Sequence, residues 1–212
     1  MPSYNLQLQF DKKSLKEVKS AKQRIMIAKP VNSASPNVIW LSIDPFESTE
    51  VSWSEEYGIY ASTTAVQHGA SITKISETGV PAQDGAYYNL TPETVFDGPY
   101  TDPSIPRGTF AASNSVPYAE YPSLTFGLTQ SALINEKPVD RKPISASSVL
   151  ATQVVAMTPF TDVFIWLQAD FAGETIITRI FGTHTVAKFG GGTTDISLRY
   201  NPQLGKFNAQ DD

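Results

Sequence analysis

The feature that most constrains the fold of this chain is a residue alternation with a period of two. In residues 51–61, aromatic and aliphatic side chains alternate with small or acidic ones, and no helix-length apolar stripe appears. Successive side chains of a β-strand point to opposite faces, so this pattern is typical of strands. The same alternation recurs almost to the C-terminus and predicts a mainly β protein.

Period-two runs predict the individual strands. We expect them at residues 4–10, 24–29, 37–43, 49–53, 57–62, 70–76, 86–90, 123–130 and 149–157. Residues 161–200 are expected to form a C-terminal meander of four strands, 162–169, 175–181, 184–189 and 195–200, joined by glycine-containing turns. The polar tail from Asn201 is expected to fray. Together these runs predict an antiparallel β-sandwich.

Two segments depart from the alternation. Residues 13–23 carry Leu15 and Val18 among lysines, without glycine or proline, which predicts one short amphipathic helix. Residues 91–122 contain six prolines, which exclude a central strand through most of the stretch. We therefore expect a long connection there, either a functional loop or a cover over one end of a sandwich.

Size and composition favour a single domain, residues 1–212. The chain has 212 residues, 41% hydrophobic and 17% charged, enough to bury a core without disulfide or metal staples. Cysteine is absent, which excludes disulfides, thiolate zinc sites and cysteine nucleophiles. The first ten residues lack the basic start and apolar run of a secretion signal, so we expect a cytoplasmic or non-classically released protein.

Charge is distributed unevenly along the chain. The first thirty residues contain seven basic and two acidic residues, whereas the rest contains nine basic and nineteen acidic ones. The acidic remainder does not resemble a nucleic-acid surface, so no nucleic-acid partner is expected. The basic segment is either a solvated helix face or a contact for anionic lipid or an acidic partner.

Motifs for catalysis and metal binding are missing from the sequence. Only two histidines occur, His68 and His184, and no two-histidine zinc motif or nucleophile elbow surrounds them. Residues 190–192 are three glycines without a following Lys-Ser/Thr, which indicates a hairpin turn and not a phosphate-binding loop. Glu55 and Glu56 are neighbours in a predicted strand and would point to opposite faces. We therefore predict a non-enzymatic protein without a metal.

Aromatic side chains are the remaining candidates for a binding site. Trp53, Tyr57 and Tyr60 are predicted to form its edge, with Ile59 facing away from the two tyrosines. The alternative for each ring is packing in the core of the sandwich. The full set of candidate ligand-binding residues is Trp53, Tyr57, Tyr60, Tyr87, Tyr88, Tyr118 and Tyr121.

Part of the chain resembles actinoporin-like domains. The resemblance covers a basic helix from Leu15, a strand at 24–29, an Asn/Ser turn and a tryptophan strand at 38–40. It implies a β-sandwich of the kind found in pore-forming toxins and mushroom lectins. Against the toxin alternative, the lysine-rich helix has too little apolar surface to enter a bilayer on its own.

The chain as a whole resembles the pink chromoproteins of oyster mushrooms, above all in residues 51–61, 123–130 and 164–168. This resemblance in size, acidity and lack of cysteine implies a polyene pigment held non-covalently in an aromatic slot. A carboxylate on such a polyene would need a nearby cation. The candidates are Lys74, Arg107, Arg179 and Lys188.

Three hypotheses of function follow. The first is a pigment-binding protein whose partner is a hydrophobic small molecule. The alternatives are a fungal-type lectin that binds carbohydrate, and an actinoporin-like membrane-binding or pore-forming protein, the only hypothesis that involves a membrane. The sequence is compatible with a homo-oligomer.

Overall fold

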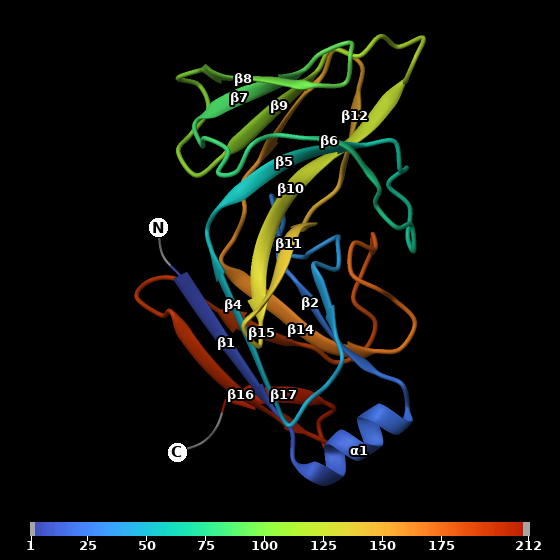
Figure 1. Cartoon of the computed structure of the whole chain (residues 1–212), viewed down its shortest axis with the longest axis vertical. Helices are drawn as coiled ribbons and strands as arrows, with labels where there is room; N and C mark the ends of the chain where they lie inside the picture. Colours follow the sequence, from blue (N-terminus) through green and yellow to red (C-terminus); the bar gives the residue numbers. More distant parts are fainter. Residues whose placement is uncertain (1–2, 210–212) are drawn as a thin grey trace.

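The computed structural model describes residues 3–209, and strands dominate them (Figure 1). Among these residues the one α-helix, α1 (Lys12–Ser20), lies near the N-terminus. It begins after Asp11, whose carboxylate accepts hydrogen bonds from the backbone N–H groups of Lys13 and Ser14, both at 2.9 Å. This is the usual chemistry of an N-cap. The mainly β fold with one short N-terminal helix is therefore confirmed, and the helix is shorter at its C-terminal end than predicted.

The largest sheet contains nine strands and runs along most of the molecule. Its first strand β1 pairs in parallel with β16 and antiparallel with β4. The long strand β10 pairs with β4 and β5 along one edge, and with β11 and β12 along the other. The strand order is β17 (Lys206–Ala209), β16 (Asp195–Asn201), β1 (Ser3–Gln9), β4 (Ser48–Ser54), β10 (Ser123–Ile134), β5 (Tyr57–Ser62) and β6 (Lys74–Glu77), with β11 (Lys137–Pro143) and β12 (Ser147–Leu150) on β10.

Two four-stranded sheets accompany the large one. The first has the order β13 (Val154–Met157), β9 (Phe110–Asn114), β7 (Ala86–Leu90) and β8 (Phe96–Thr101). The second has the order β15 (Thr185–Lys188), β14 (Asp162–Gln168), β2 (Arg24–Ala28) and β3 (Leu41–Ile43). Figure 1 shows β7, β8 and β9 at one end of the long axis and α1 at the other.

One hydrophobic cluster joins all three sheets and makes the arrangement a sandwich. Alternate residues of the large sheet, such as Leu6, Val51 and Ile59, enter this cluster. Ile27 of the β2 sheet and Phe110 of the β9 sheet enter it from the other layer. The same face of the large sheet is therefore covered by both small sheets.

The proline-rich stretch 91–122 differs from the prediction. It contains two strands, β8 and β9, and β9 lies inside its sheet between β13 and β7. The reason is local, because residues 107–116, between Pro106 and Pro117, contain no proline and can donate their backbone N–H groups. The expectation of a long connection without a central strand through most of the stretch therefore fails at β9, which has a neighbouring strand on each side.

The predicted C-terminal meander is only partly present. β14 and β15 pair as neighbours, but Thr175 and Ile176 form only isolated bridges. β16 leaves this sheet and pairs with β1, so the last predicted hairpin is wrong. The expected fraying after Asn201 is also wrong up to residue 209, because β17 pairs with β16 and buries Phe207 completely.

Candidate functional site

A groove crosses the outer face of the small sheet that contains β9. In β7 the side chains of Tyr88 and Leu90 point into the core, so Tyr87 points outward. Tyr87 is in register with Ala111 of β9, which is in register with Ala156 of β13. A tyrosine at one side of two alanines leaves a hollow along this row, because a methyl group covers far less of a sheet than a ring.

The loop between β8 and β9 forms the second wall of this hollow. The hollow has a volume of about 520 Å³. We call it the β9 groove and define it by its lining residues, Tyr87, Asp102, Ser104, Ile105, Pro106, Thr109, Ala111, Val154 and Ala156. Most of the side chains along its floor and walls are apolar, which suits a hydrophobic ligand.

Hydrogen bonds hold the loop in place beside the groove. The Asp84 carboxylate accepts a hydrogen bond from the backbone N–H of Gly108 at 2.6 Å, and the hydroxyls of Thr109 and Thr158 are 2.8 Å apart. The Asp102 carboxylate accepts from the Ser104 hydroxyl at 2.7 Å and from its backbone N–H at 2.9 Å. These bonds lower the pKa of Asp102, so this side chain is ionised at neutral pH.

An aromatic pair borders the groove on the β8 side. The rings of Tyr87 and Tyr100 have centroids 5.2 Å apart and planes inclined by 33°. The Tyr100 hydroxyl donates a hydrogen bond to the Asp97 carboxylate, which raises the pKa of this phenol. The Tyr100 phenol is therefore neutral at physiological pH.

Of the seven aromatic residues singled out in the sequence, Tyr87 alone lines the β9 groove. Tyr88 faces the core, and its hydroxyl accepts the backbone N–H of Gln83 at 2.9 Å. Tyr121 packs half-buried against the main core, and Tyr118 is 70% exposed. Of these four tyrosines, the structure therefore places only Tyr87 in the groove.

Trp53 and Tyr57 lie in the core around a fully buried lysine. The ammonium of Lys29 is 2.9 Å from Glu55 Oε1, 2.8 Å from Gln130 Oε1 and 3.4 Å from the Tyr57 hydroxyl. Aromatic rings enclose it, with centroids 5.4–5.7 Å from the nitrogen. We define the Lys29 cluster as Lys29, Trp40, Trp53, Glu55, Tyr57 and Gln130.

Interactions within the Lys29 cluster offset the cost of burying the Lys29 ammonium. Loss of water lowers the pKa of Lys29, and the Glu55 carboxylate opposes this change. Burial, together with Glu55, raises the pKa of Tyr57 well above its usual value. Glu55 also accepts hydrogen bonds from the Tyr57 hydroxyl and from the Trp53 indole. The cluster pairs its own charges and Lys29, Trp53 and Tyr57 are all buried, so these rings are core elements.

Tyr60 lies on the opposite face of β5 from Tyr57 and Ile59. It belongs to a separate buried cluster, whereas Tyr57 and Ile59 share the main core. The prediction that Ile59 faces away from both tyrosines was therefore wrong, because residues two apart in a strand point the same way. The Tyr60 hydroxyl donates to the Ser145 carbonyl at 2.7 Å, and its ring rests against Gly127.

A second depression, of about 510 Å³, lies beside Trp53 on the large sheet. Ser52, Ser54 and Ser131 line it together with Leu133 and other residues of β10 and β11. Four serines take part in the lining, and the one aromatic residue in it, Trp53, is buried. It offers less aromatic surface than the β9 groove.

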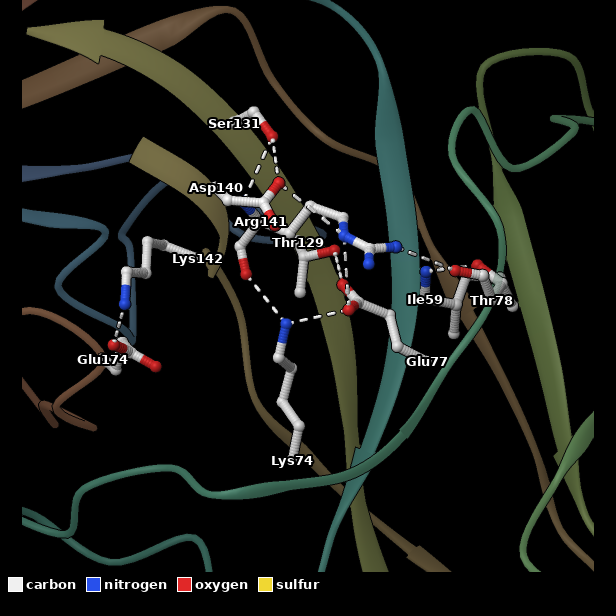
Figure 2. Close-up of polar contacts among 10 residues, drawn as sticks. All are labelled: Ile59, Lys74, Glu77, Thr78, Thr129, Ser131, Asp140, Arg141, Lys142 and Glu174. Carbon is white, nitrogen blue, oxygen red and sulfur yellow. Dashed lines mark hydrogen bonds and ion pairs between the residues drawn. The ribbon is translucent and has the colours of Figure 1, made fainter. Parts of the chain in front are cut away.

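The four candidate cations have different surroundings. The Lys74 ammonium is 2.8 Å from the Glu77 carboxylate and donates to the Arg141 carbonyl at 2.9 Å; both contacts are drawn in Figure 2. Arg179 stacks on the Phe181 ring, 4.4 Å from its centroid. Lys188 is exposed on β15, and Arg107 is exposed in the loop that walls the β9 groove. Arg107 is therefore the candidate nearest in sequence to the groove lining.

The residues that sequence reasoning missed are the small ones. Ala111 and Ala156 form the floor, but a short side chain carries no chemical signal in one sequence. Ile105 and Pro106 were read as part of an undivided connection. The proline-free interval 107–116 is the one sequence signal for a strand at this place, and it does not reveal the groove itself.

Fold and groove together define a mainly β protein with a candidate small-molecule site. Within residues 3–209, no group of three or more metal-binding side chains occurs, and no helix has the length and apolarity to cross a membrane. Comparison with known proteins finds no matching family model, no matching curated protein and no matching solved structure.

Proposed function

We propose that this chain is a non-enzymatic binding protein that holds a conjugated, hydrophobic small molecule non-covalently in the β9 groove. The observation that carries the proposal is the apolar floor of Ala111 and Ala156 beside the paired, mutually tilted rings of Tyr87 and Tyr100. Flat conjugated molecules gain from contact with ring faces and from burial of their apolar surface.

The dimensions of the groove fit an extended ligand. Three neighbouring strands span about 10 Å at the usual strand spacing. A volume of about 520 Å³ lies within the range of small-molecule sites. Arg107 offers a cation for a carboxylate at one end of a polyene, while the ionised Asp102 disfavours that group at its own position.

The absorption spectrum of protein purified from its native source tests the proposal. A bound polyene adds a band above 300 nm, and organic extraction removes it. A spectrum with only the ordinary aromatic band, and an extract without pigment, would contradict the proposal.

A titration of recombinant protein locates the site. All-trans retinoic acid serves as a carboxylated polyene probe, followed by its absorption shift. Ala156→Trp fills the groove from its exposed edge, and we expect at least tenfold weaker binding. Leu150→Trp adds the same ring at an exposed position of β12, outside the groove, and should leave binding unchanged. Equal binding by both variants would place the ligand elsewhere.

A lectin is the second candidate, favoured by one polar feature of the same face. Asn89 Oδ1 accepts hydrogen bonds from Ser113 at 2.8 Å and from Ser115 at 2.6 Å, next to the tyrosine pair. Sugars are bound by stacking on aromatic rings together with such hydroxyl and amide groups. Glycan-array binding that Tyr100→Ala abolishes would favour this candidate, and a blank array would remove it.

A further inference from the structure

Helix α1 presents a surface of lysines without ionic partners. Lys12, Lys16 and Lys19 lie at positions i, i+4 and i+7, so they share one face of the helix, and all are exposed. Lys13 and Lys22 are exposed beside them. Within residues 3–209, none of these five lysines forms an ion pair.

The acidic groups near this face leave most of its charge uncompensated. The Asp11 carboxylate is engaged with the first turn of the helix, including the Ser14 hydroxyl at 2.6 Å. Glu17 is exposed on the helix, and Glu47 borders the hollow beside it. Two free carboxylates thus face five lysines.

An exposed aromatic ring adjoins the lysines. Phe46 is 48% exposed, and the Lys19 ammonium lies 5.5 Å from its centroid. Leu15, half-buried, lies between the lysine face and the core side of the helix. Basic residues around an exposed apolar ring are the chemistry of a peripheral membrane contact.

The position of α1 decides what kind of anionic partner fits. Figure 1 shows it at one end of the long axis, opposite β7, β8 and β9. From residue 31 on, the chain contains nine basic and nineteen acidic residues. A long polyanion that wraps the protein would meet this acidic body, whereas a flat anionic surface touches the end of the molecule alone.

We propose that the α1 end of the molecule, defined by Lys12, Lys16, Lys19 and Phe46, docks on the surface of an anionic phospholipid bilayer. The lysines contact the phosphate and carboxylate groups of the lipid headgroups, and Phe46 enters the interface. The contact is peripheral and reversible, and it does not depend on the function proposed for the β9 groove.

Vesicle co-sedimentation of the full chain tests this docking. We expect binding to phosphatidylcholine vesicles with 30% phosphatidylserine at 50 mM salt, little at 300 mM, and none to pure phosphatidylcholine. Each lysine near an anionic membrane contributes about fivefold in affinity, so Lys12→Gln, Lys16→Gln and Lys19→Gln together should weaken binding about 100-fold. Phe46→Ser should weaken it further.

A matched triple variant provides the control. Lys137→Gln, Arg179→Gln and Lys188→Gln remove the same charge from exposed positions outside α1 and should change binding less than threefold. Unchanged circular dichroism shows that both triple variants are folded. Absence of binding to anionic vesicles at 50 mM salt, or equal weakening by both triple variants, overturns the proposal. Retention on DNA or heparin without vesicle binding also overturns it.

Discussion

Lys29 shows how one residue can combine opposite physical demands. A lone ammonium is costly to bury, yet this one is fully buried between a carboxylate, an amide and aromatic rings. Glu55 is the counter-ion, and its side chain retains 16% exposure. The charge of Lys29 is therefore balanced by the Glu55 carboxylate and not by water.

Removing that counter-ion should destabilise the protein strongly. We expect Glu55→Gln to lower the free energy of unfolding by about 3 kcal/mol, because it leaves a buried charge without its partner. Combining it with Lys29→Met removes the charge and keeps an apolar chain between the rings, so part of the loss should return. Urea denaturation measures the free energy of unfolding of the single and the double variant. Glu56→Gln, at the exposed neighbouring position, is the control. A double variant less stable than Glu55→Gln would contradict this account.

Gly127 occupies a position with no room for a side chain. A Cβ atom there would lie 1.9 Å from the Ser145 carbonyl oxygen and 2.6 Å from the Tyr60 ring. We expect Gly127→Ala to cost about 3 kcal/mol or more, since backbone must move to admit the methyl group. Gly79→Ala adds a methyl where no atom lies within 4 Å and should be nearly neutral. Equal melting temperatures for the two variants would refute the steric argument.

At the scale of elements, an asparagine side chain completes an interrupted pairing. Asn37 donates to the Ala146 carbonyl at 2.6 Å and accepts the Ala146 N–H at 3.2 Å, as a paired strand residue would. Asn32 makes the same two kinds of bond with Ala156 and Thr158 at the end of β13. These amides satisfy backbone groups that a neighbouring strand would otherwise bind.

Replacing the donor half of this pairing tests its contribution. Asn37→Asp keeps the acceptor but sets a carboxylate against the Ala146 carbonyl, so we expect a loss of about 2 kcal/mol at neutral pH. Asn201 uses only its oxygen, which accepts from Gln203 and Leu204, so Asn201→Asp should change stability by under about 0.5 kcal/mol. Guanidinium denaturation measures the stability of both variants. Similar losses of stability in the two would contradict a role for the amide donor of Asn37.

The sequence predicted elements well where the pattern was local. β5 and β7 have the predicted bounds, because each alternates or stays apolar between clear turns. β11 is not among the predicted strands, because Pro138 and Pro143 interrupt its pattern, although an edge strand tolerates proline. The Lys29 cluster and the β9 groove could not be predicted, because Gln130 lies 101 residues from Lys29. Period-two alternation predicts which face of the sheet a side chain lies on. It does not predict which residue of the opposite sheet that side chain contacts.

At the scale of the whole molecule, the shared hydrophobic cluster should make unfolding cooperative. Tyr88 and Phe110 at one end of the molecule belong to the same cluster as Phe10 and Val18 at the other. We expect urea unfolding followed by tryptophan fluorescence and by far-UV circular dichroism to give coincident transitions. Trp40, Trp53 and Trp166 report the half around β2 and β4, whereas dichroism reports all sheets. A dichroism transition that precedes the fluorescence change would instead indicate two independent domains.

The parallel pairing of β1 with β16 has a consequence for synthesis on the ribosome. Asn5 pairs with Asp195, which lies 190 residues later in the chain. One edge of β1 therefore has no native partner until β16 has been synthesised. At 5–20 residues per second this interval is roughly 10–40 s. Throughout it, the nascent chain exposes a strand edge able to pair with other chains. Chaperone dependence and aggregation during expression should therefore respond to changes in β16 more than to changes in strands that pair early, such as β4.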